Sequence, residues 1–239
     1  MKQIVLKLLT SIIVTLTACS SEQHKIASID EASGISYCQN SGTLMVANDE
    51  GSLYEITPKG EIVSRHKIGK YDLEGVVCED KEVILAVEDG LLLKVDRKTF
   101  QTKELKIKGD GFKFDKKSGI EGIAKIGNLY YLAIQAKDKE KAKLLIVKAG
   151  TNYAKIKKII KHGIIDSAGM EYHNKRLYIV SDKKDKLYIY NLKTNKVLKK
   201  IKLDKFAQEG VSFDNSGNIF FADDNGAVFR YTTKELGIR

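Results

Sequence analysis

The sequence predicts an all-β protein, a β-propeller with five blades. A glycine followed by an aliphatic residue recurs five times, with spacings of 41, 47, 47 and 41 residues. This matches the length of a four-stranded propeller blade, about 40–50 residues. The apolar runs between these glycines are short, rich in β-branched residues and separated by turn residues, which favours strands over helices. The repeat glycines are Gly34, Gly75, Gly122, Gly169 and Gly210.

Each repeat continues in the same order after its glycine strand. A second apolar strand that ends in a polar residue is predicted at 44–48, 83–88, 129–135, 177–182 and 219–223. A third strand is predicted at 53–56, 91–95, 144–147, 187–192 and 227–231. Turn motifs such as Asp49-Glu50-Gly51 and Asp89-Gly90 lie between these strands and indicate hairpins. The pattern therefore predicts antiparallel blades.

A fourth, lysine-rich strand follows in the first four repeats, for example at 197–203. The fifth repeat has too little chain after Tyr231 for such a strand. Because residues 25–29 resemble 200–203, we expect the N-terminal segment to supply the missing outer strand and close the ring. Ring closure removes sheet edges. Six blades are the alternative, because the stretch 106–117 is long and contains glycine; we interpret it as a loop.

The first residues have the layout of a secretory signal peptide. Lys2 and Lys7 supply a basic region around an apolar stretch from 4 to 16. This stretch is shorter than the roughly 20 apolar residues needed to span a bilayer. It ends in Leu16-Thr17-Ala18-Cys19, which resembles the lipobox of bacterial lipoproteins. We therefore expect a signal peptide at 1–18, a lipidated tether at 19–24 and a propeller domain at 25–239.

Acylation of Cys19 would make a lipid bilayer the first partner of this protein. Several acyl chains hold a protein on a membrane essentially permanently. The alternative, an ordinary signal peptide with a chance cysteine, would leave a stray thiol in an oxidising compartment, which is disfavoured. Ser20 follows Cys19, and the absence of aspartate there favours the outer membrane, facing the periplasm, over the inner membrane.

The formal net charge is +10, and removal of Lys2 and Lys7 leaves +8. The lysines are spread over every repeat and alternate with other residues, as in 103–108. This spacing favours a solvated outer strand face, so we expect no nucleic-acid partner. The chain has one proline, Pro58, and nothing that marks a linker. We expect one domain and a monomer.

Cys38 and Cys78 have neither metal-ligand spacing nor a companion histidine. We expect them to be buried free thiols on neighbouring strands. A disulfide formed after export is the alternative.

Oxygen-bearing side chains recur at two positions that a propeller places at the same end of its channel. Before the repeat glycine stand Glu74, Glu121 and Glu209, with Ser33 and Ala168 in the other two repeats. At the end of the second strand stand Asn48, Glu88, Gln135, Asp182 and Asp223. The sequence thus predicts an acidic ring at one mouth of the channel.

Carboxylates gathered on a ring raise one another's pKa and need a cation to stay ionised. Ca²⁺, a hard cation that takes many oxygen ligands, fits them. Glu74, Glu121 and Glu209 are therefore candidate calcium ligands. The alternative is that each caps its own turn without a metal. For the residues at the strand ends we favour the turn role, because Asp and Asn serve turns generally. The position that follows is glycine in every repeat because the backbones of neighbouring inner strands approach closely at the channel axis.

At these motifs the chain resembles the SdiA-regulated family of bacterial β-propellers, which is similar to NHL-type propellers and esterase-like phytase propellers. The resemblance rests on the segments 31–37, 46–51, 72–76, 120–124 and 208–214, and it covers nearly all of the mature chain. It implies calcium at the channel, although Ala168 departs from the pattern in the fourth repeat. The family has no settled activity.

No catalytic motif is present. The four histidines, His24, His66, His162 and His173, are scattered over different repeats, and their spacing assembles neither a zinc site nor a Ser-His-Asp triad. We expect a binding module that presents its channel mouth to a small anionic ligand or an envelope protein. A Ca²⁺-dependent phosphoesterase and a purely structural envelope scaffold are the alternatives.

Overall fold

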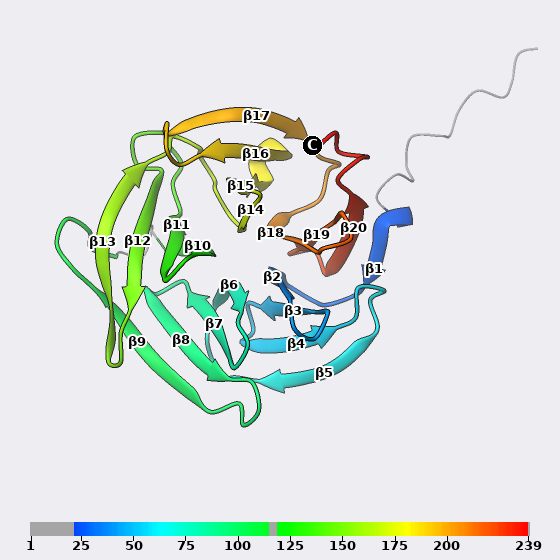
Figure 1. The fold of residues 1–239 in the computed structure, drawn as a ribbon, viewed down its shortest axis with the longest axis horizontal. Coiled ribbons are helices and arrows are strands. Elements are labelled where there is room, and N and C mark those ends of the chain that lie inside the picture. The colour runs from blue at the N-terminus through cyan, green and yellow to red at the C-terminus, as the bar shows by residue number, and fades with distance from the viewer. Residues whose placement is uncertain (1–21, 115–118, 239) are drawn as a thin grey trace, which may run out of the picture.

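The computed structural model describes residues 22–114 and 119–238, which form a ring of five four-stranded blades (Figure 1). The five-bladed prediction is confirmed. The predicted signal peptide and Cys19 lie outside the described residues. Within the described ranges, no helix is long and apolar enough to cross a membrane.

In each blade the strands follow one another from the channel outwards. Blade 1 comprises β2 (Ala32–Cys38), β3 (Thr43–Asn48), β4 (Ser52–Ile56) and β5 (Ile62–Lys67). Blade 2 comprises β6 (Leu73–Cys78), β7 (Glu82–Val87), β8 (Leu91–Asp96) and β9 (Thr102–Lys108). Blade 3 comprises β10 (Ile120–Ile126), β11 (Leu129–Ile134), β12 (Lys143–Ala149) and β13 (Tyr153–Lys161). Blade 4 comprises β14 (Met170–His173), β15 (Arg176–Ser181), β16 (Lys186–Asn191) and β17 (Lys196–Lys202). Blade 5 comprises β18 (Gln208–Phe213), β19 (Asn218–Asp223), β20 (Ala227–Thr232) and β1 (Lys25–Ala27).

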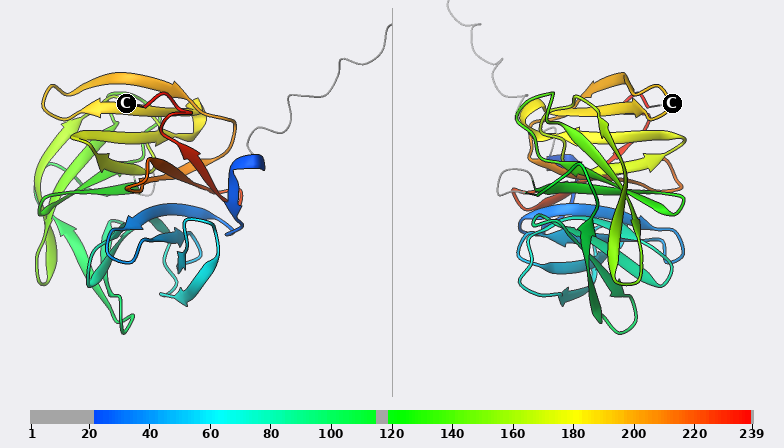
Figure 2. Two further views of the ribbon diagram at one scale, coloured as in Figure 1. Left: turned by 45° about the vertical axis from the view of Figure 1, so that its right-hand side comes forward. Right: turned by 90° about the vertical axis from the view of Figure 1, so that its left-hand side faces the viewer.

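The N-terminal strand closes the ring, as the sequence predicts. β1 pairs antiparallel with β20, with Lys25 opposite Phe229. A short 3₁₀ helix, η1 (Glu22–His24), precedes it, and the His24 ring stacks on Tyr231 with the ring centroids 3.9 Å apart. Figure 2 shows this N-terminal segment, in dark blue, at the outer edge of the ring.

Blades 2 and 3 are joined through their outer strands. β13 pairs in parallel with the last residues of β9, with Tyr153 opposite Lys106, so the two blades form one eight-stranded sheet. Interpreting 106–117 as a loop was therefore wrong for Lys106–Lys108, which belong to β9. The described residues after Lys108 carry no strand before Ile120, which excludes an additional blade between these two.

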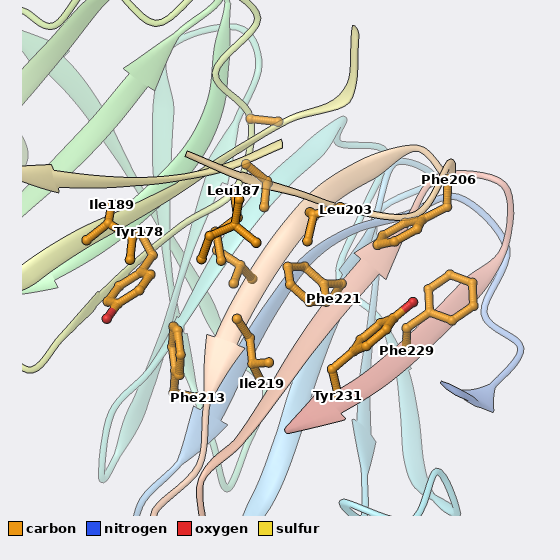
Figure 3. Close-up of a cluster of buried hydrophobic side chains, with 14 of the residues drawn as sticks. Tyr178, Leu187, Ile189, Leu203, Phe206, Phe213, Ile219, Phe221, Phe229 and Tyr231 are labelled. Atoms are coloured by element: carbon orange, nitrogen blue, oxygen red, sulfur yellow. The ribbon is translucent and has the colours of Figure 1, made fainter. Parts of the chain in front are cut away.

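The hydrophobic core fills the spaces between blades. Alternate residues of one strand point to opposite faces. Phe221 on β19 packs in the cluster shared with blade 4, whereas Phe220 packs on the blade 1 side. The first of these clusters contains Phe206, Phe213, Phe229 and Tyr231 as well (Figure 3). Burial on both faces explains why the second strands read as continuous apolar runs.

The repeat glycines line the channel axis, where each inner strand touches the next. A Cβ on Gly34 would lie 2.7 Å from the Gly75 Cα, and one on Gly122 or Gly169 would overlap the backbone carbonyl of Ala168 or Glu209. A Cβ on Gly210 would lie 3.0 Å from the Ile35 nitrogen, which completes the circle. The channel at this level leaves only about 10 Å³ for the centre of a water molecule. Close approach is therefore why these positions are glycine.

A disulfide joins Cys38 and Cys78, with Cα atoms 5.3 Å apart, so the free-thiol prediction was wrong. The two cysteines end the inner strands of blades 1 and 2. The Cys78 N–H donates to the Ser36 hydroxyl at 3.0 Å, which fixes the two strand ends side by side. Neighbouring inner strands therefore bring these thiols within bonding distance, although 40 residues separate them in sequence.

Candidate metal site at the channel mouth

One sharp turn places two acidic segments of neighbouring blades together. The turn 49–51 between β3 and β4 includes Gly51, whose φ of +79° favours glycine. The Gly51 carbonyl accepts a hydrogen bond at 2.9 Å from the Ile68 N–H, in the loop that leads into blade 2. A side chain on Gly51 would overlap the backbone of this loop at Gly69. Close packing of the turn on the loop sets Asp49 beside Asp72.

Asp49, Asp72 and Glu74 form a group of three carboxylates contributed by blades 1 and 2. One carboxylate oxygen from each lies within 4.8 Å of the others. Asp49 follows the second strand of blade 1, whereas Glu74 is on the inner strand of blade 2. Oxygens gathered in this way are the ligands that a hard divalent cation prefers.

A shallow cavity of about 400 Å³, broadly open to solvent, lies beside this group. Its lining residues are Glu31, Asp49, Glu50, Lys70, Tyr71 and Asp72. Four of these six side chains are acidic, and Lys70 is exposed. The Tyr71 hydroxyl donates to Glu104 at 2.8 Å, which fixes the ring at the cavity wall. A small ligand can therefore reach Asp49 and Asp72 of this group from solvent.

Burial raises the pKa of the carboxyl groups at this mouth. The pKa of Glu74 rises to about 11, with further contributions from neighbouring acids, Glu121 first. Burial is also the largest cause for Asp49, Glu121 and Glu209, whose pKa values rise to about 7, 8 and 9. Without a cation, these groups therefore hold protons at a pH at which isolated carboxyl groups are ionised.

Two buried carboxylate oxygens have no hydrogen-bond partner among the described residues, Asp49 Oδ1 and Glu209 Oε2. Buried polar atoms are nearly always paired, so an unpaired oxygen in a cluster of acids is a place for a cation. The residues present therefore fit a metal ion, and Asp49 supplies an oxygen that the fold leaves free.

The structure brings Glu74, Glu121 and Glu209 into one electrostatic cluster, because Glu121 and Glu209 both raise the pKa of Glu74. The group with ligand atoms close enough for one ion, however, includes only Glu74 of the three. Asp166, which raises the pKa of Glu121 and Glu209, forms an ion pair with Lys183 at 2.8 Å. Lys183 of this pair places a positive charge on the side of blade 4, where Ala168 stands at the position that Glu74, Glu121 and Glu209 occupy in blades 2, 3 and 5.

Three of the other predicted mouth residues form hydrogen bonds with backbone groups. The Asn48 side chain accepts from the Ser52 N–H at 2.8 Å and donates to the Asp30 carbonyl at 3.2 Å. Asp223 accepts from the Ala207 N–H at 2.9 Å and from the Asn225 N–H at 3.2 Å. Ser33 donates to the carbonyl of Leu73. The contacts of Asn48 and Asp223 fit the turn role favoured by the sequence, whereas the Ser33 contact joins blade 1 to the inner strand of blade 2.

The remaining three differ from one another. Burial raises the pKa of Glu88, and a hydrogen bond with Asp72 adds to this. Asp182 begins the short helix η2 (Asp182–Lys184), and its pKa is raised by burial and then by Asp166. Gln135 follows β11, and its backbone N–H donates to the Gly119 carbonyl at 2.9 Å. Of these, Glu88 is the one linked directly to the three-carboxylate group.

Asp49 and Asp72 were not among the predicted ligands. Both are visible in the sequence: Asp49 directly follows Asn48, and Asp72 lies two residues before Glu74. The repeat pattern singles out one position before each glycine and one at the end of each second strand. Asp49, one residue further into the turn, and Asp72, directly before β6, fall outside these two positions.

The fold and the site together define the class of protein: a five-bladed propeller whose channel is constricted by glycines and whose open mouth is rich in carboxylates. Within that class, the family model described as SdiA-regulated matches residues 10–231, and the chain belongs to the SdiA-regulated family. Among solved structures, it is similar to a glutaminyl cyclase from Myxococcus xanthus, with a TM-score of 0.66. Sequence identity is 13%, with 87% of this chain and 92% of that chain covered, so the likeness shows the fold. Comparison with curated proteins gave no match.

Proposed function

We propose that this protein is a lipid-anchored envelope propeller that binds Ca²⁺ at its acidic mouth and presents the ion to a small anionic ligand or an envelope protein. The observation that carries the proposal is the group Asp49, Asp72 and Glu74, with ligand atoms within 4.8 Å of one another beside an open cavity. The unpaired Asp49 Oδ1 supports the same assignment.

The arrangement favours a metal with open coordination positions. Ca²⁺ takes six to eight oxygen ligands. Three carboxylates on one side would leave positions on the cavity side for water or for an anionic group of a ligand. Lys70 lines the same cavity and would pair with such an anion. Binding would require Asp49 and Glu74 to lose their protons, so the ion and protons compete for the site.

The envelope location rests on three observations. Leu16-Thr17-Ala18-Cys19 has the pattern of a lipid-attachment site. The Cys38–Cys78 disulfide is typical of exported proteins. β1 lies at the outer edge of the ring, so a short tether from Cys19 can reach it without crossing the propeller. The proposal includes an outer-membrane anchor facing the periplasm, and a monomer that binds no nucleic acid.

Calcium titration of the chain from residue 20 onward tests the metal assignment. At pH 8 we expect saturable heat of Ca²⁺ binding and a rise in melting temperature, both much weaker with Mg²⁺, which demands stricter octahedral geometry. At a calcium concentration of 100 times Kd, the gain in stability is about 2.7 kcal/mol. D49N/D72N/E74Q should lose both signals.

The matched control is Asp80→Asn, which removes one negative charge from the exposed β6–β7 hairpin at the other end of the channel. It should leave calcium binding unchanged. Comparing E121Q/E209Q with the triple variant then tells whether the other predicted glutamates are ligands or contribute only charge. If neither wild type nor triple variant responds to millimolar calcium, the site assignment is wrong and the structural scaffold is favoured. If both bind calcium equally, the ion lies elsewhere and the site assignment is again wrong.

A second candidate function, a Ca²⁺-dependent phosphoesterase, is favoured by one observation: Lys70 shares the cavity with the carboxylate group. The bound ion would polarise a phosphoryl oxygen, while Lys70 would hold the phosphate. Calcium-dependent hydrolysis of phosphomonoesters that falls at least tenfold in both Lys70→Met and Asp72→Asn would support it. If the protein binds calcium but hydrolyses no phosphomonoester, the phosphoesterase is excluded and the binding module stays the proposed function.

A further inference from the structure

The structure describes four exposed large hydrophobic side chains, and two of them are adjacent. Ile62 and Val63, which open β5, are each 56% exposed, whereas Tyr153 and Leu198 stand on other blades. β5 is the outermost strand of blade 1 and pairs, among the described strands, with β4 alone. An exposed aliphatic pair on an edge strand is a feature that proteins usually cover or avoid.

This pair lies next to the N-terminal strand. The hairpin 57–61 that leads into β5 rests on β1, where Gly60 packs so tightly that a side chain would overlap the Ile26 carbonyl. On the same side, Arg230 of β20 donates to the Pro58 carbonyl at 3.1 Å. β5 and β1 also lie on the same side of the ring in Figure 1.

The surface around the pair is basic. Lys25, Lys59 and Arg65 are all exposed, and the Arg65 guanidinium lies 5.1 Å from the centre of the Tyr54 ring. Glu61, at the end of the hairpin, is the exposed acid beside them. We name Lys25, Lys59, Ile62, Val63 and Arg65 the tether-side strip. Aliphatic residues bordered by cations suit the boundary between lipid headgroups and acyl chains.

The chain that precedes the structure determines how far this strip can be from the membrane. Cys19 is six residues before Lys25. Six residues span at most about 20 Å when fully extended. If Cys19 carries lipid, Lys25 at the start of β1 lies within this distance of the bilayer surface, and the hairpin 57–61 packs on the next residue, Ile26.

We propose that the tether-side strip rests on an anionic bilayer, so that the lipid anchor and β5 hold the propeller at two points. This inference rests on the anchor in the proposed function. It adds a fixed orientation: β1 runs from the tether towards Glu31, which lines the mouth cavity, so the mouth is at the end of β1 away from the membrane.

The test supplies the anchor chemically, so that it does not depend on acylation in cells. The Cys38–Cys78 disulfide leaves Cys19 as the free thiol of a chain that starts at this residue. Coupled through Cys19 to maleimide lipid, the chain is held on vesicles that contain phosphatidylglycerol or phosphatidylcholine alone. Amide hydrogen exchange of Ile62–Lys67 is compared with that of the uncoupled protein.

We expect exchange across Ile62–Lys67 to slow at least about fivefold on phosphatidylglycerol vesicles, since each cation near an anionic surface contributes about 1 kcal/mol. The slowing should be smaller on phosphatidylcholine and should largely disappear in I62S/V63S. The control is Leu198→Ser, which alters a residue that is 50% exposed on β17 and should leave the protection of β5 intact.

Equal exchange on vesicles and in solution would overturn the proposal. Protection of β5 that grows with protein concentration in the absence of vesicles would also overturn it, and would assign the strip to a second copy of the chain. Acylation of Cys19 in cells is measured separately, from the mass of the processed protein. The anchor and the strip can therefore fail independently.

Discussion

Gly122→Ala and Gly169→Ala are expected to lower the free energy of unfolding by about 3 kcal/mol each, at the upper end of the usual range for overpacking. In both cases the added methyl group would overlap a backbone carbonyl of the next blade, at Ala168 or Glu209. Backbone at the channel axis is held by the strands of both blades, so relief requires the blades to separate. A loss of this size lowers the melting temperature by about 10 °C in a domain of this length.

Gly75→Ala is the internal control for this prediction. Its methyl group would lie 3.0 Å from the Cγ2 atom and 3.1 Å from the nitrogen of Ile123, a contact that a small shift relieves. We expect a cost of about 1 kcal/mol. Urea denaturation of the three variants measures the difference. Equal stabilities, or Gly75→Ala as the least stable, would contradict the packing of the glycine ring as described.

Raising the pH from 6.5 to 8 without calcium is expected to destabilise the protein. Burial raises the pKa of Glu74 to about 11 and that of Glu209 to about 9, so the folded protein keeps protons that the unfolded chain has already lost above its ordinary glutamate pKa, 4.5. The folded state thus binds more protons, and its stability falls as the pH rises. Each carboxyl group that stays protonated across this window contributes about 2 kcal/mol to the fall.

The window is chosen to exclude the opposing effect of His162, whose pKa burial lowers to about 4 and which therefore destabilises the fold only as the pH drops below 6.5. E74Q/E209Q should flatten the pH dependence, because glutamine cannot titrate. A residual slope should remain from Asp49, Glu121 and Glu171, whose pKa values burial raises to about 7, 8 and 8. Calcium should oppose the fall in wild type. Urea denaturation at three pH values measures the fall in the free energy of unfolding. An identical pH dependence in wild type and E74Q/E209Q would refute the buried acidic cluster.

Much of the fold was predictable because the repeat unit recurs at similar spacings of 41 to 47 residues. The repeat glycines, the apolar second strands and an N-terminal outer strand within residues 25–29 all follow from local pattern. The parallel pairing of β9 with β13 did not, because it depends on how two outer strands meet in space. The prediction of free thiols at Cys38 and Cys78 failed for a related reason. Sequence does not tell how closely the ends of β2 and β6 approach.

The candidate site was predictable as a region but not as a set of ligands. The aligned glutamates located the acidic mouth, and Glu74 belongs to the carboxylate group. Asp49 and Asp72 join it because the turn at Gly51 packs on the loop around Gly69. That contact connects two blades, and no spacing within one repeat reveals it.

The central claim is that Asp49, Asp72 and Glu74 hold one calcium ion, and anomalous diffraction from crystals grown at pH 8 with saturating calcium tests it most directly. The account predicts an anomalous peak among these carboxylates, with calcium–oxygen distances of about 2.3–2.6 Å. It also predicts further electron density on the cavity side, at the positions left for water or an anion. A map at saturating calcium with no peak there, or with the ion bound elsewhere, would contradict the account.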